Sequence, residues 1–414
     1  MTIFLLIFEY YKSNKAVYRL KKKLPKEIIA FIDFFKKKRK PEVKNSKLIL
    51  TDIFRVPHHL YITQLVCNNL SKKYNFNIAT YNTKPRDTYN ELYDSLQIYK
   101  HLKINSAFID ILKILKTFNI FFKNKKSKEN LLNFKINKIN LGIDIYESIL
   151  KTGKPTVKIN SISTYYYFLL GLKYFFYFEK LFKKKKIGAC FLSHDCYIQC
   201  GILSKLAIKY KIPLFYVNER GITYSDQNFD NYFIFKRYKK YFKYLVKDKK
   251  KARRKSKLDL TLRLRGKVGV KMSYQTESAF TQNVTNLQIC KSKKKKILIA
   301  THCFYDNPHG YGKMIFPDFW EWLSYIKKIA NISKHDWYIK PHRDYLPNTI
   351  ENIKKVISDS KIKLIDVNTS FHQIKKEGVD FVVTKHGSVG HELPLLGFTV
   401  INFGYNPHIN YNFN

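Results

Sequence analysis

The sequence has few of the residues that mark a secreted, disulfide-stabilised or fibrous protein. Its 414 residues include only 6 Cys, 15 Gly and 12 Pro. The cysteines, at positions 67, 190, 196, 200, 290 and 303, follow no disulfide spacing, and a chain of this length does not need disulfides to fold. We therefore exclude a disulfide scaffold and expect a cytoplasmic protein with buried free thiols at Cys196 and Cys200.

A long hydrophobic run is also missing. The opening T-I-F-L-L-I-F is much shorter than the roughly 20 apolar residues that cross a bilayer, and no basic segment precedes it. The aromatic stretch 163–178 contains Lys173 and several tyrosines, which suits a core helix better than a membrane span. The sequence therefore predicts no transmembrane helix.

Acidic residues are scarce, with 31 Asp and Glu against 77 Lys and Arg, for a formal net charge of +46. Most basic residues are lysines accompanied by abundant Asn, Ile, Tyr and Phe, a mixture typical of an AT-rich genome. Base recognition favours arginine, so this surplus does not predict a specific nucleic-acid partner. It favours attraction to anionic headgroups, and we expect a peripheral position on the inner face of the cytoplasmic membrane.

What the sequence does contain is a regular alternation of strands and helices. Short apolar runs predict strands, and amphipathic or aromatic stretches predict the helices between them. Alternation of this kind predicts parallel β-α-β units with right-handed crossovers. The expected strands are 48–54, 77–81, 187–193, 212–218, 297–302, 337–340, 363–366, 380–384 and 398–403, and the expected helices include 57–73, 161–182, 196–211, 318–330, 350–358 and 369–376.

The expected fold is therefore α/β, with two Rossmann-like domains whose parallel sheets face a cleft, as in GT-B proteins. We expect a basic helical segment at 1–45, a first domain at 46–285, a basic linker at 286–296 and a second domain at 297–414. Few residues follow the last predicted strand. A terminal covering helix is therefore expected to be missing, and the two alternatives are that the second domain has no such helix or that the sequence is a truncated product.

Polar clusters follow three predicted strands of the second domain. They are T-H-C-F-Y-D-N-P-H-G at 301–310, K-P-H-R at 340–343 and K-H-G-S-V-G-H-E at 385–392. Because ligands of such sheets bind outside the carboxyl ends of the strands, three clusters at strand ends predict a binding pocket. Taken alone, the glycines of the third cluster fit a simple tight turn equally well.

The third cluster has the composition of a phosphate site. Gly387 and Gly390 allow close approach of the backbone to a ligand, and Ser388 is placed to cap a following helix. The amino end of a helix attracts phosphate, and Glu392 can accept hydrogen bonds from sugar hydroxyls. Positive charge is expected from Lys340, His342 and Lys385, and His302 is a further candidate phosphate contact.

The segment V-D-F-V-V-T-K-H-G-S-V-G-H-E-L-P-L-L-G-F-T-V-I resembles the donor-site segment of bacterial capsule and surface-polysaccharide glycosyltransferases. This group includes Kdo (3-deoxy-octulosonate) transferases of GT-B fold. Similar stretches occur at 141–150, 193–207, 316–323 and 340–342, so the resemblance spans most of residues 48–408. It implies a nucleotide-sugar donor on the second domain, held by His386, Gly387, Ser388, Gly390 and Glu392, and an acceptor glycan or glycolipid on the first.

The resemblance also implies a metal-independent reaction without a cofactor, since the nucleotide-sugar is itself the substrate. An inverting transfer needs a general base on the first domain. The candidates are His194 and Asp195, which follow the strand at 187–193, and Glu219, which follows the strand at 212–218. Asp195 fits a helix cap as well, Glu219 fits an ion pair with Arg220, and His58 and His59 fit a helix entrance.

The leading hypothesis is a glycosyltransferase that moves a sugar, Kdo-like sugars among the candidates, from a nucleotide donor to a growing capsule or surface glycan. A nucleotide-sugar epimerase or a glycerophosphate polymer transferase of similar fold is the first alternative. The second alternative is a non-catalytic, basic scaffold at a membrane, which the lysine content favours.

Overall fold

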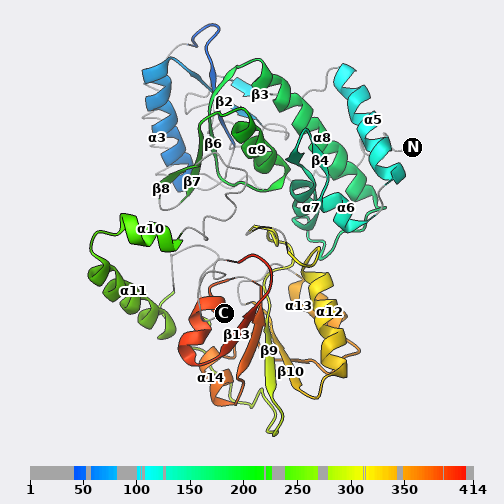
Figure 1. Cartoon of the computed structure of the whole chain (residues 1–414), viewed down its shortest axis with the longest axis vertical. Coiled ribbons are helices and arrows are strands. Elements are labelled where there is room, and N and C mark those ends of the chain that lie inside the picture. Colours follow the sequence, from blue (N-terminus) through cyan, green and yellow to red (C-terminus); the bar gives the residue numbers. More distant parts are fainter. Residues whose placement is uncertain are drawn as a thin grey trace, which may run out of the picture. The chain divides into compact units, whose positions relative to one another are not determined.

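The computed structural model describes residues 42–52, 57–81, 100–102, 104, 108–124, 127–218, 221–225, 238–268, 278–310, 312, 314–342, 348–385 and 387–406. These residues form two compact α/β units (Figure 1). The first unit extends to Asn231, apart from the stretch Leu150–Val157, and the second contains that stretch and everything from Tyr232 onward. Most of the expected N-terminal segment 1–45 lies outside the described residues.

The first unit is built on a six-stranded sheet with the order β3-β2-β1-β6-β7-β8. Its first five strands are parallel, and β8 pairs antiparallel with β7. The chain runs outward from β1 to β3 and then returns to β6 on the other side of β1, so the connections diverge between β1 and β6. The strands are β1 (Leu48–Thr51), β2 (Asn77–Tyr81), β3 (Lys100–Leu102), β6 (Ile187–Leu192), β7 (Leu214–Asn218) and β8 (Gly221–Tyr224).

Helices pack on this sheet because their apolar side chains are buried against it. In α8 (Ile162–Lys183), Ser161 caps the first turn by accepting a bond from the Thr164 backbone N–H, and Phe168 and Phe175 are fully buried. The aromatic stretch is thus a core helix, as its tyrosines predicted. The other elements are α3 (Pro57–Tyr74), α5 (Phe108–Asn124), α6 (Lys128–Leu132), the hairpin β4 (Lys135–Ile136) and β5 (Ile139–Asn140), α7 (Gly142–Leu150), the π-helical turn η2 (Tyr197–Gly201) and α9 (Ile202–Lys209).

The second unit carries a five-stranded, fully parallel sheet with the order β11-β10-β9-β12-β13. Here the connections diverge between β9 and β12. The strands are β9 (Lys296–Ala300), β10 (Asp336–Lys340), β11 (Lys363–Leu364), β12 (Phe381–Thr384) and β13 (Thr399–Asn402). The helices are α10 (Tyr238–Leu245), α11 (Lys249–Leu264), α12 (Phe319–Ile332), α13 (Thr349–Ile357), α14 (Phe371–Lys376), α15 (Val389–Glu392) and the 3₁₀ turn η4 (Leu393–Leu396).

Both faces of the second sheet are covered by apolar cores. On β9, Ile299 belongs to the core under α12 and α13, whereas Leu298 and Ala300 belong to the core under α14 and η4. This alternation is the period of two that a strand imposes on its side chains. Burial on both faces explains why the strands read as continuous apolar runs in the sequence.

The predicted α/β class with two Rossmann-like domains is confirmed, and two such units in one chain give it a GT-B-like domain composition. The division between the domains differs from the expected linker at 286–296. Phe280 and Ile289 are buried in the core of the second unit, so the described residues before β9 already belong to it. The basic stretch K-S-K-K-K-K at 291–296 does not distinguish the two cases, because exposed charge is typical of a solvated surface as well as of a linker.

No helix of the described part of the chain is long and apolar enough to cross a membrane.

Candidate functional site

The polar clusters of the second unit meet at the point where its strand connections diverge. Thr301 and His302 follow β9, Lys340 and His342 close β10, and the turn after β12 supplies the rest. Together they line a small pocket of about 80 Å³. Such a divergence point is where open α/β sheets bind ligands. The lining also includes Arg263 of α11, Ala279, Ala300, Pro341, Phe371, Gly387, Ser388, Val389 and Glu392.

Two histidines form one wall of this pocket. The rings of His302 and His342 lie 5.4 Å apart, and His302 also stacks on Phe319 at 6.0 Å between ring centroids. Burial lowers the pKa of His302 to about 4, and the neighbouring His342 and Lys385 add to this effect. His302 is therefore neutral near pH 7 and acts as a hydrogen-bonding group rather than a cation.

The two lysines of the site have different environments. Lys340 is 4% exposed, its ammonium donates to the Val367 carbonyl, and it lies 5.7 Å from the centroid of the Phe371 ring. Lys385 is 1% exposed and donates to the Pro308 carbonyl at 2.8 Å. Lys340 thus lines the pocket, whereas Lys385 ties the 301–310 loop to the end of β12.

The glycine-rich turn after β12 is shaped as expected in part. Gly387 has a φ of +115°, which favours glycine, and an added Cβ there would lie 4.0 Å from the His302 ring. Ser388 opens α15, but its side chain makes no capping bond, so the predicted cap is absent. Because α15 is a single turn that continues as η4, its dipole is short. Gly390 is buried within this turn and does not line the pocket.

Glu392 has a partner that the sequence did not suggest. Its carboxylate is 3% exposed and accepts a charge-assisted bond from Arg263 Nε at 3.1 Å. Arg263 lies near the end of α11, far away in the sequence and inside a basic run where one arginine carries no distinguishing signal. His386, expected beside Glu392, lies outside the described residues.

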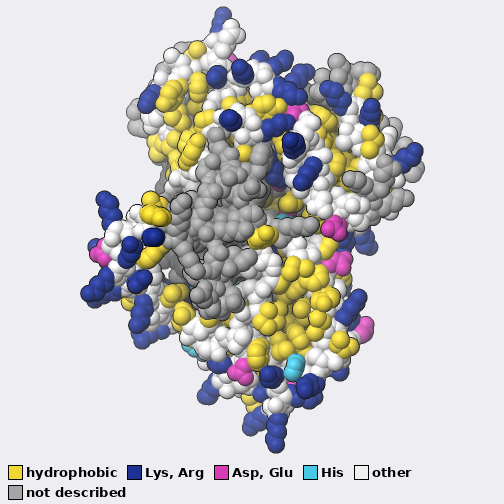
Figure 2. All heavy atoms as spheres, viewed as in Figure 1, with side chains coloured by type: hydrophobic (Ala, Val, Ile, Leu, Met, Phe, Trp, Pro, Cys, Tyr) yellow, Lys and Arg dark blue, Asp and Glu magenta, His cyan; other side chains and the backbone are white. Residues whose placement is uncertain are grey.

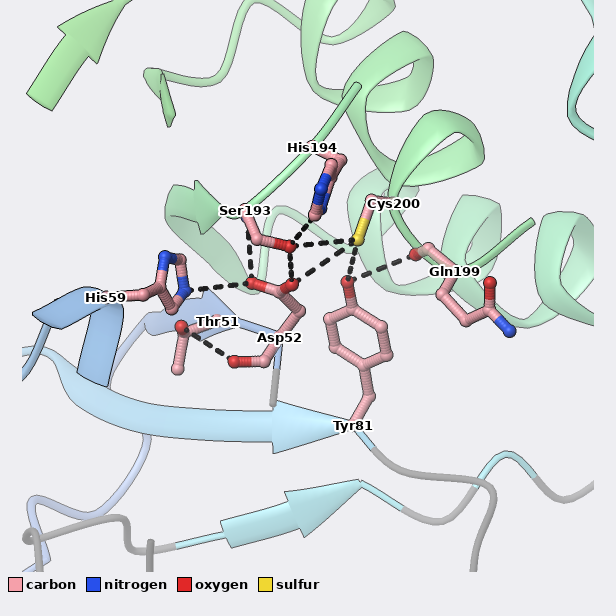
Figure 3. Close-up of polar contacts among 8 residues, drawn as sticks. All are labelled: Thr51, Asp52, His59, Tyr81, Ser193, His194, Gln199 and Cys200. Carbon is pink, nitrogen blue, oxygen red and sulfur yellow. Dashed lines mark hydrogen bonds and ion pairs between the residues drawn. The ribbon is translucent and has the colours of Figure 1, made fainter. Parts of the chain in front are cut away.

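A second polar cluster lies at the divergence point of the first unit, between β1 and β6 (Figure 3). Asp52 directly follows β1, and Ser193 and His194 follow β6. The Ser193 hydroxyl donates to Asp52 Oδ2, and the Ser193 backbone N–H donates to Asp52 Oδ1 at 3.0 Å. His194 Nδ1 lies 2.7 Å from Ser193 Oγ. His59 of α3 approaches the other side, with its Nε2 3.7 Å from Asp52 Oδ1.

This order of contacts sets the proton positions. Burial works to raise the pKa of Asp52, but contacts with His59, Ser193 and His194 outweigh it and hold that pKa below the ordinary value. Asp52 is therefore ionised, and it accepts the hydrogen bond that the only hydroxyl proton of Ser193 can donate. The serine oxygen can then only accept from His194 Nδ1–H, which leaves the lone pair of the neutral imidazole on Nε2. His194 is exposed, so it has the tautomer and the access of a general base.

Other groups close the buried side of this cluster. Cys200 Sγ lies 3.5 Å from Asp52 Oδ2, and the Tyr81 hydroxyl lies 3.9 Å from the same sulfur and donates to the Gln199 carbonyl. Cys196 and Cys200 are buried free thiols, as the sequence predicted. Burial raises the pKa of both, so they remain protonated near neutral pH.

The two residues of the predicted His194–Asp195 pair have different environments, since His194 is exposed and Asp195 is directed toward the interior of the unit. Asp195 is half-buried, and burial raises its pKa, while the charges of His194 and Lys205 oppose that rise. It does not cap the following helix, because η2 starts at Tyr197 with no side-chain cap. Its electrostatic neighbours include Asp144 and Lys205, so it belongs to the interior of the unit. Glu219, the third candidate, lies outside the described residues.

A buried ion pair lies beside the loop that follows β6, on its interior side. Lys205 of α9 donates to Asp144 Oδ2 of α7 at 2.6 Å and to the Asn140 carbonyl at 2.8 Å. Burial raises the pKa of Asp144 to about 6, despite the opposing effect of Lys205. Gly201 is required here, because a Cβ at that position would lie 2.1 Å from Asp144 Oδ1.

His194 is a candidate from the sequence alone, whereas Asp52 and Ser193, which hold it, are not. The signal in the sequence is that each of these polar residues directly follows an apolar run that predicts a buried strand. In the structure the two strands pair with each other, with Thr51 opposite Phe191. Their pairing is decided by strand order, which the sequence does not display. The sequence around His59 fits a helix entrance, whereas in the structure His59 is 1% exposed and faces Asp52.

The low pKa of His302 makes the second unit sensitive to acid. The unfolded chain binds a proton at the ordinary pKa of 6.5 and the folded chain only near 4, so stability is full above pH 6.5 and falls as the pH decreases toward 4. The expected loss is about 3 kcal/mol. Replacing His302→Gln should flatten this dependence. All three tryptophans, Trp320, Trp322 and Trp337, lie in this unit, so urea unfolding followed by tryptophan fluorescence reports it selectively. Equal pH slopes for both proteins would contradict the prediction.

Comparisons with known proteins give a distant structural likeness. No protein-family model matches the chain, and no curated protein sequence matches it. It is similar to the beta Kdo 2,4 transferase KpsC of Thermosulfurimonas dismutans, with 12% identity and a TM-score of 0.37 over 56% of this chain and 73% of that one. It is also similar to UDP-GlcNAc 2-epimerase from Neisseria meningitidis bound to UDP-GlcNAc, with 12% identity and a TM-score of 0.22 over 86% of this chain and 81% of that one. At these values neither likeness bears on the site residues or on the reaction.

Proposed function

We propose that the protein is a glycosyltransferase that moves a sugar from a nucleotide-activated donor to a surface glycan or glycolipid. The observation that carries the proposal is the pocket of the second unit. Two imidazoles (His302 and His342), the Lys340 ammonium and the Gly387 turn meet there at the carboxyl ends of β9, β10 and β12. Helices separate these strands along the chain, and their pairing in the parallel sheet brings the polar residues at their carboxyl ends to one pocket.

The pocket suits the phosphates of a nucleotide-sugar. Lys340 supplies a fixed positive charge, and neutral His302 together with His342 supplies hydrogen-bonding groups. In such a reaction the leaving nucleotide gains negative charge, and prearranged donors stabilise that charge more in the transition state than in the ground state. The Arg263–Glu392 pair closes the same pocket and holds Glu392 in position for a sugar or ribose hydroxyl.

The first unit supplies the acceptor-side chemistry in this proposal. In an inverting transfer, His194 Nε2 takes the proton of the acceptor hydroxyl as that oxygen attacks the anomeric carbon of the donor. The bond from this carbon to the donor phosphate breaks at the same time, and the nucleotide leaves with the bonding electrons. Ser193 and ionised Asp52 hold the ring and stabilise the imidazolium that forms. We further propose that the enzyme works on the inner face of the cytoplasmic membrane, to which its formal net charge of +46 would attract it.

Nucleotide binding tests the donor site. Calorimetry with CMP, UMP, UDP and GDP should give measurable affinity for one of them, and His342→Ala should weaken it by about tenfold to 100-fold, because a hydrogen bond to a charged group contributes roughly 1.5–3 kcal/mol. The matched control is His335→Ala, since His335 precedes β10 at the opposite end of the same strand. Absence of binding to every nucleotide by the unaltered chain would overturn the proposal.

The epimerase alternative is separated by leaving out the acceptor. A transferase incubated with its nucleotide-sugar alone returns that sugar unchanged apart from slow hydrolysis, whereas an epimerase converts it to its stereoisomer. Chromatography of the recovered sugar nucleotide distinguishes the two outcomes.

A further inference from the structure

The second unit carries a strongly basic helical hairpin that none of the proposed chemistry uses. We define the basic hairpin as residues 242–259, which comprise the end of α10, the turn and most of α11. From Lys249 to Asp259 every side chain except Ala252 is exposed. Figure 2 shows basic side chains crowded over this hairpin, with hydrophobic side chains among them. A 16-residue helix with no buried residue is unusual, because helices of globular domains gain most of their stability from an apolar face.

The charge of α11 is of one sign. Its sequence K-K-K-A-R-R-K-S-K-L-D-L-T-L-R-L holds eight basic residues and a single acid, Asp259. Asp248 precedes the helix and is used as its cap, since its carboxylate accepts a bond from the Lys251 backbone N–H at 2.8 Å. Among the described side chains of the hairpin, little acid is available to neutralise this charge.

Apolar side chains are exposed in the middle of this charge. Tyr244 is 66% exposed, Leu245 is 71% exposed and Leu258 is 57% exposed. On α11, Lys251, Arg254 and Lys255 precede Leu258 by seven, four and three positions, which places all four on one helix face. Basic groups surrounding solvent-exposed aliphatic and aromatic side chains match the pattern of a helix that lies in a membrane interface.

The hairpin is also presented rigidly. Arg253 lies 6.0 Å from the Phe242 ring and joins the two helices. At the other end of α11, Leu264 packs against the core, its carbonyl contacts His372 Nε2 at 2.9 Å, and Arg263 pairs with Glu392. The helix is thus fixed at its carboxyl end, while its basic amino-terminal turns extend into solvent.

We propose that the basic hairpin docks the second unit onto an anionic lipid bilayer. Its lysines and arginines contact the phosphate headgroups, and Tyr244, Leu245 and Leu258 enter the interfacial layer. Exposed leucines favour lipid over nucleic acid, since they add nothing to contacts with a phosphodiester backbone. This inference rests on the proposed function, because it assigns the expected membrane contact to one surface of the protein. Its readout is vesicle binding, which is measured separately from nucleotide binding.

Vesicle flotation of the full chain tests the surface. The unaltered protein should float with phosphatidylcholine vesicles that contain phosphatidylglycerol, remain unbound with phosphatidylcholine alone, and be released by salt. The triple variant Lys251→Gln, Arg254→Gln, Lys255→Gln should bind about 100-fold more weakly, at roughly fivefold per lost charge. Leu245→Ser with Leu258→Ser should also weaken binding while the net charge is unchanged.

The matched control is Lys291→Gln, Lys293→Gln, Lys294→Gln, which removes the same charge from the other exposed basic run of this unit. If it lowers flotation as much as the hairpin variant does, only the overall charge matters and the inference is wrong. Tighter binding of single-stranded RNA than of anionic vesicles, through the same residues, would also overturn it. Nucleotide affinity measured alongside should be equal in all of these variants, so loss of docking and loss of the donor site are distinguishable.

Discussion

Replacing His194 with alanine is expected to lower kcat by about 10²–10⁴-fold, the usual contribution of a positioned general base. The ring is exposed and its Nδ1 contacts Ser193, so in the proposed reaction the basic Nε2 would be the nitrogen that meets the acceptor hydroxyl. The pocket proposed to bind the donor is lined by residues of the second unit, so the affinity for the nucleotide should stay within about twofold of the unaltered value. Single-turnover transfer and calorimetry on the same preparation measure both quantities.

A positioning role for Ser193 gives this prediction a second readout. Ser193→Ala removes the group that fixes the tautomer of His194 and should reduce kcat by a smaller factor, with a shifted acidic limb in the pH profile. Ser193→Thr keeps the hydroxyl and should recover part of the loss. If His194→Ala retains full activity with an unchanged pH profile, the base is another residue, and Glu219 becomes the next candidate.

The variant Lys205→Met should destabilise the first unit by about 3–5 kcal/mol at pH 8. It leaves the Asp144 carboxylate, which is 1% exposed, without its counter-charge. The pKa of Asp144 is already raised to about 6 by burial and will rise further, so the folded state binds a proton more readily than the unfolded state. The loss of stability should therefore be largest at alkaline pH and shrink as the pH falls toward 5. Hydrogen exchange of peptides from α7 and α9, compared at two pH values, measures it.

The matched control for this pair is Lys209→Met, one turn later on α9. Lys209 binds Glu179 at 3.1 Å but is 28% exposed, so its removal should cost less than about 1 kcal/mol. The double variant Lys205→Met with Asp144→Asn should recover stability relative to Lys205→Met alone, because the unpaired charge is gone. If Lys205→Met and Lys209→Met lower the free energy of unfolding by similar amounts, the buried pair contributes no more to stability than the partly exposed one, and the prediction is wrong.

The fold was predictable because its strands are buried on both faces. Runs such as I-L-I-A and F-V-V-T contain the apolar residues that a doubly covered parallel sheet requires, so their positions differ from the observed β9 and β12 by one or two residues. Short strands with weak patterns were missed. The edge strand β3 (Lys100–Leu102) has only three residues and β8 (Gly221–Tyr224) is mostly exposed, so neither presents a continuous apolar run.

The site was predictable to the level of strand ends. Polar residues directly after buried strands identified His302, Lys340, His342 and the Gly387 turn, and the structure brings these four to one pocket. The same rule applied to Asp52 and Ser193, but no sequence pattern says that β1 and β6 are neighbours when more than a hundred residues separate them. The sequence also does not show that Arg263 pairs with Glu392, because this contact depends on where the carboxyl end of α11 lies in the folded unit.

The sequence by itself determined the period and burial of the strands, the α/β class, and the presence of histidines, lysines and glycines where strands end. Only the tertiary structure decided which of these groups meet, and in what ionisation state. Burial and neighbouring charge keep His302 neutral, ionise Asp52 and orient His194, because a pKa or a tautomer depends on solvent exclusion and on contacts that the chain makes only after it folds. The sequence shows that lysines are abundant, but only the folded structure shows that α11 gathers several of them on an exposed helix.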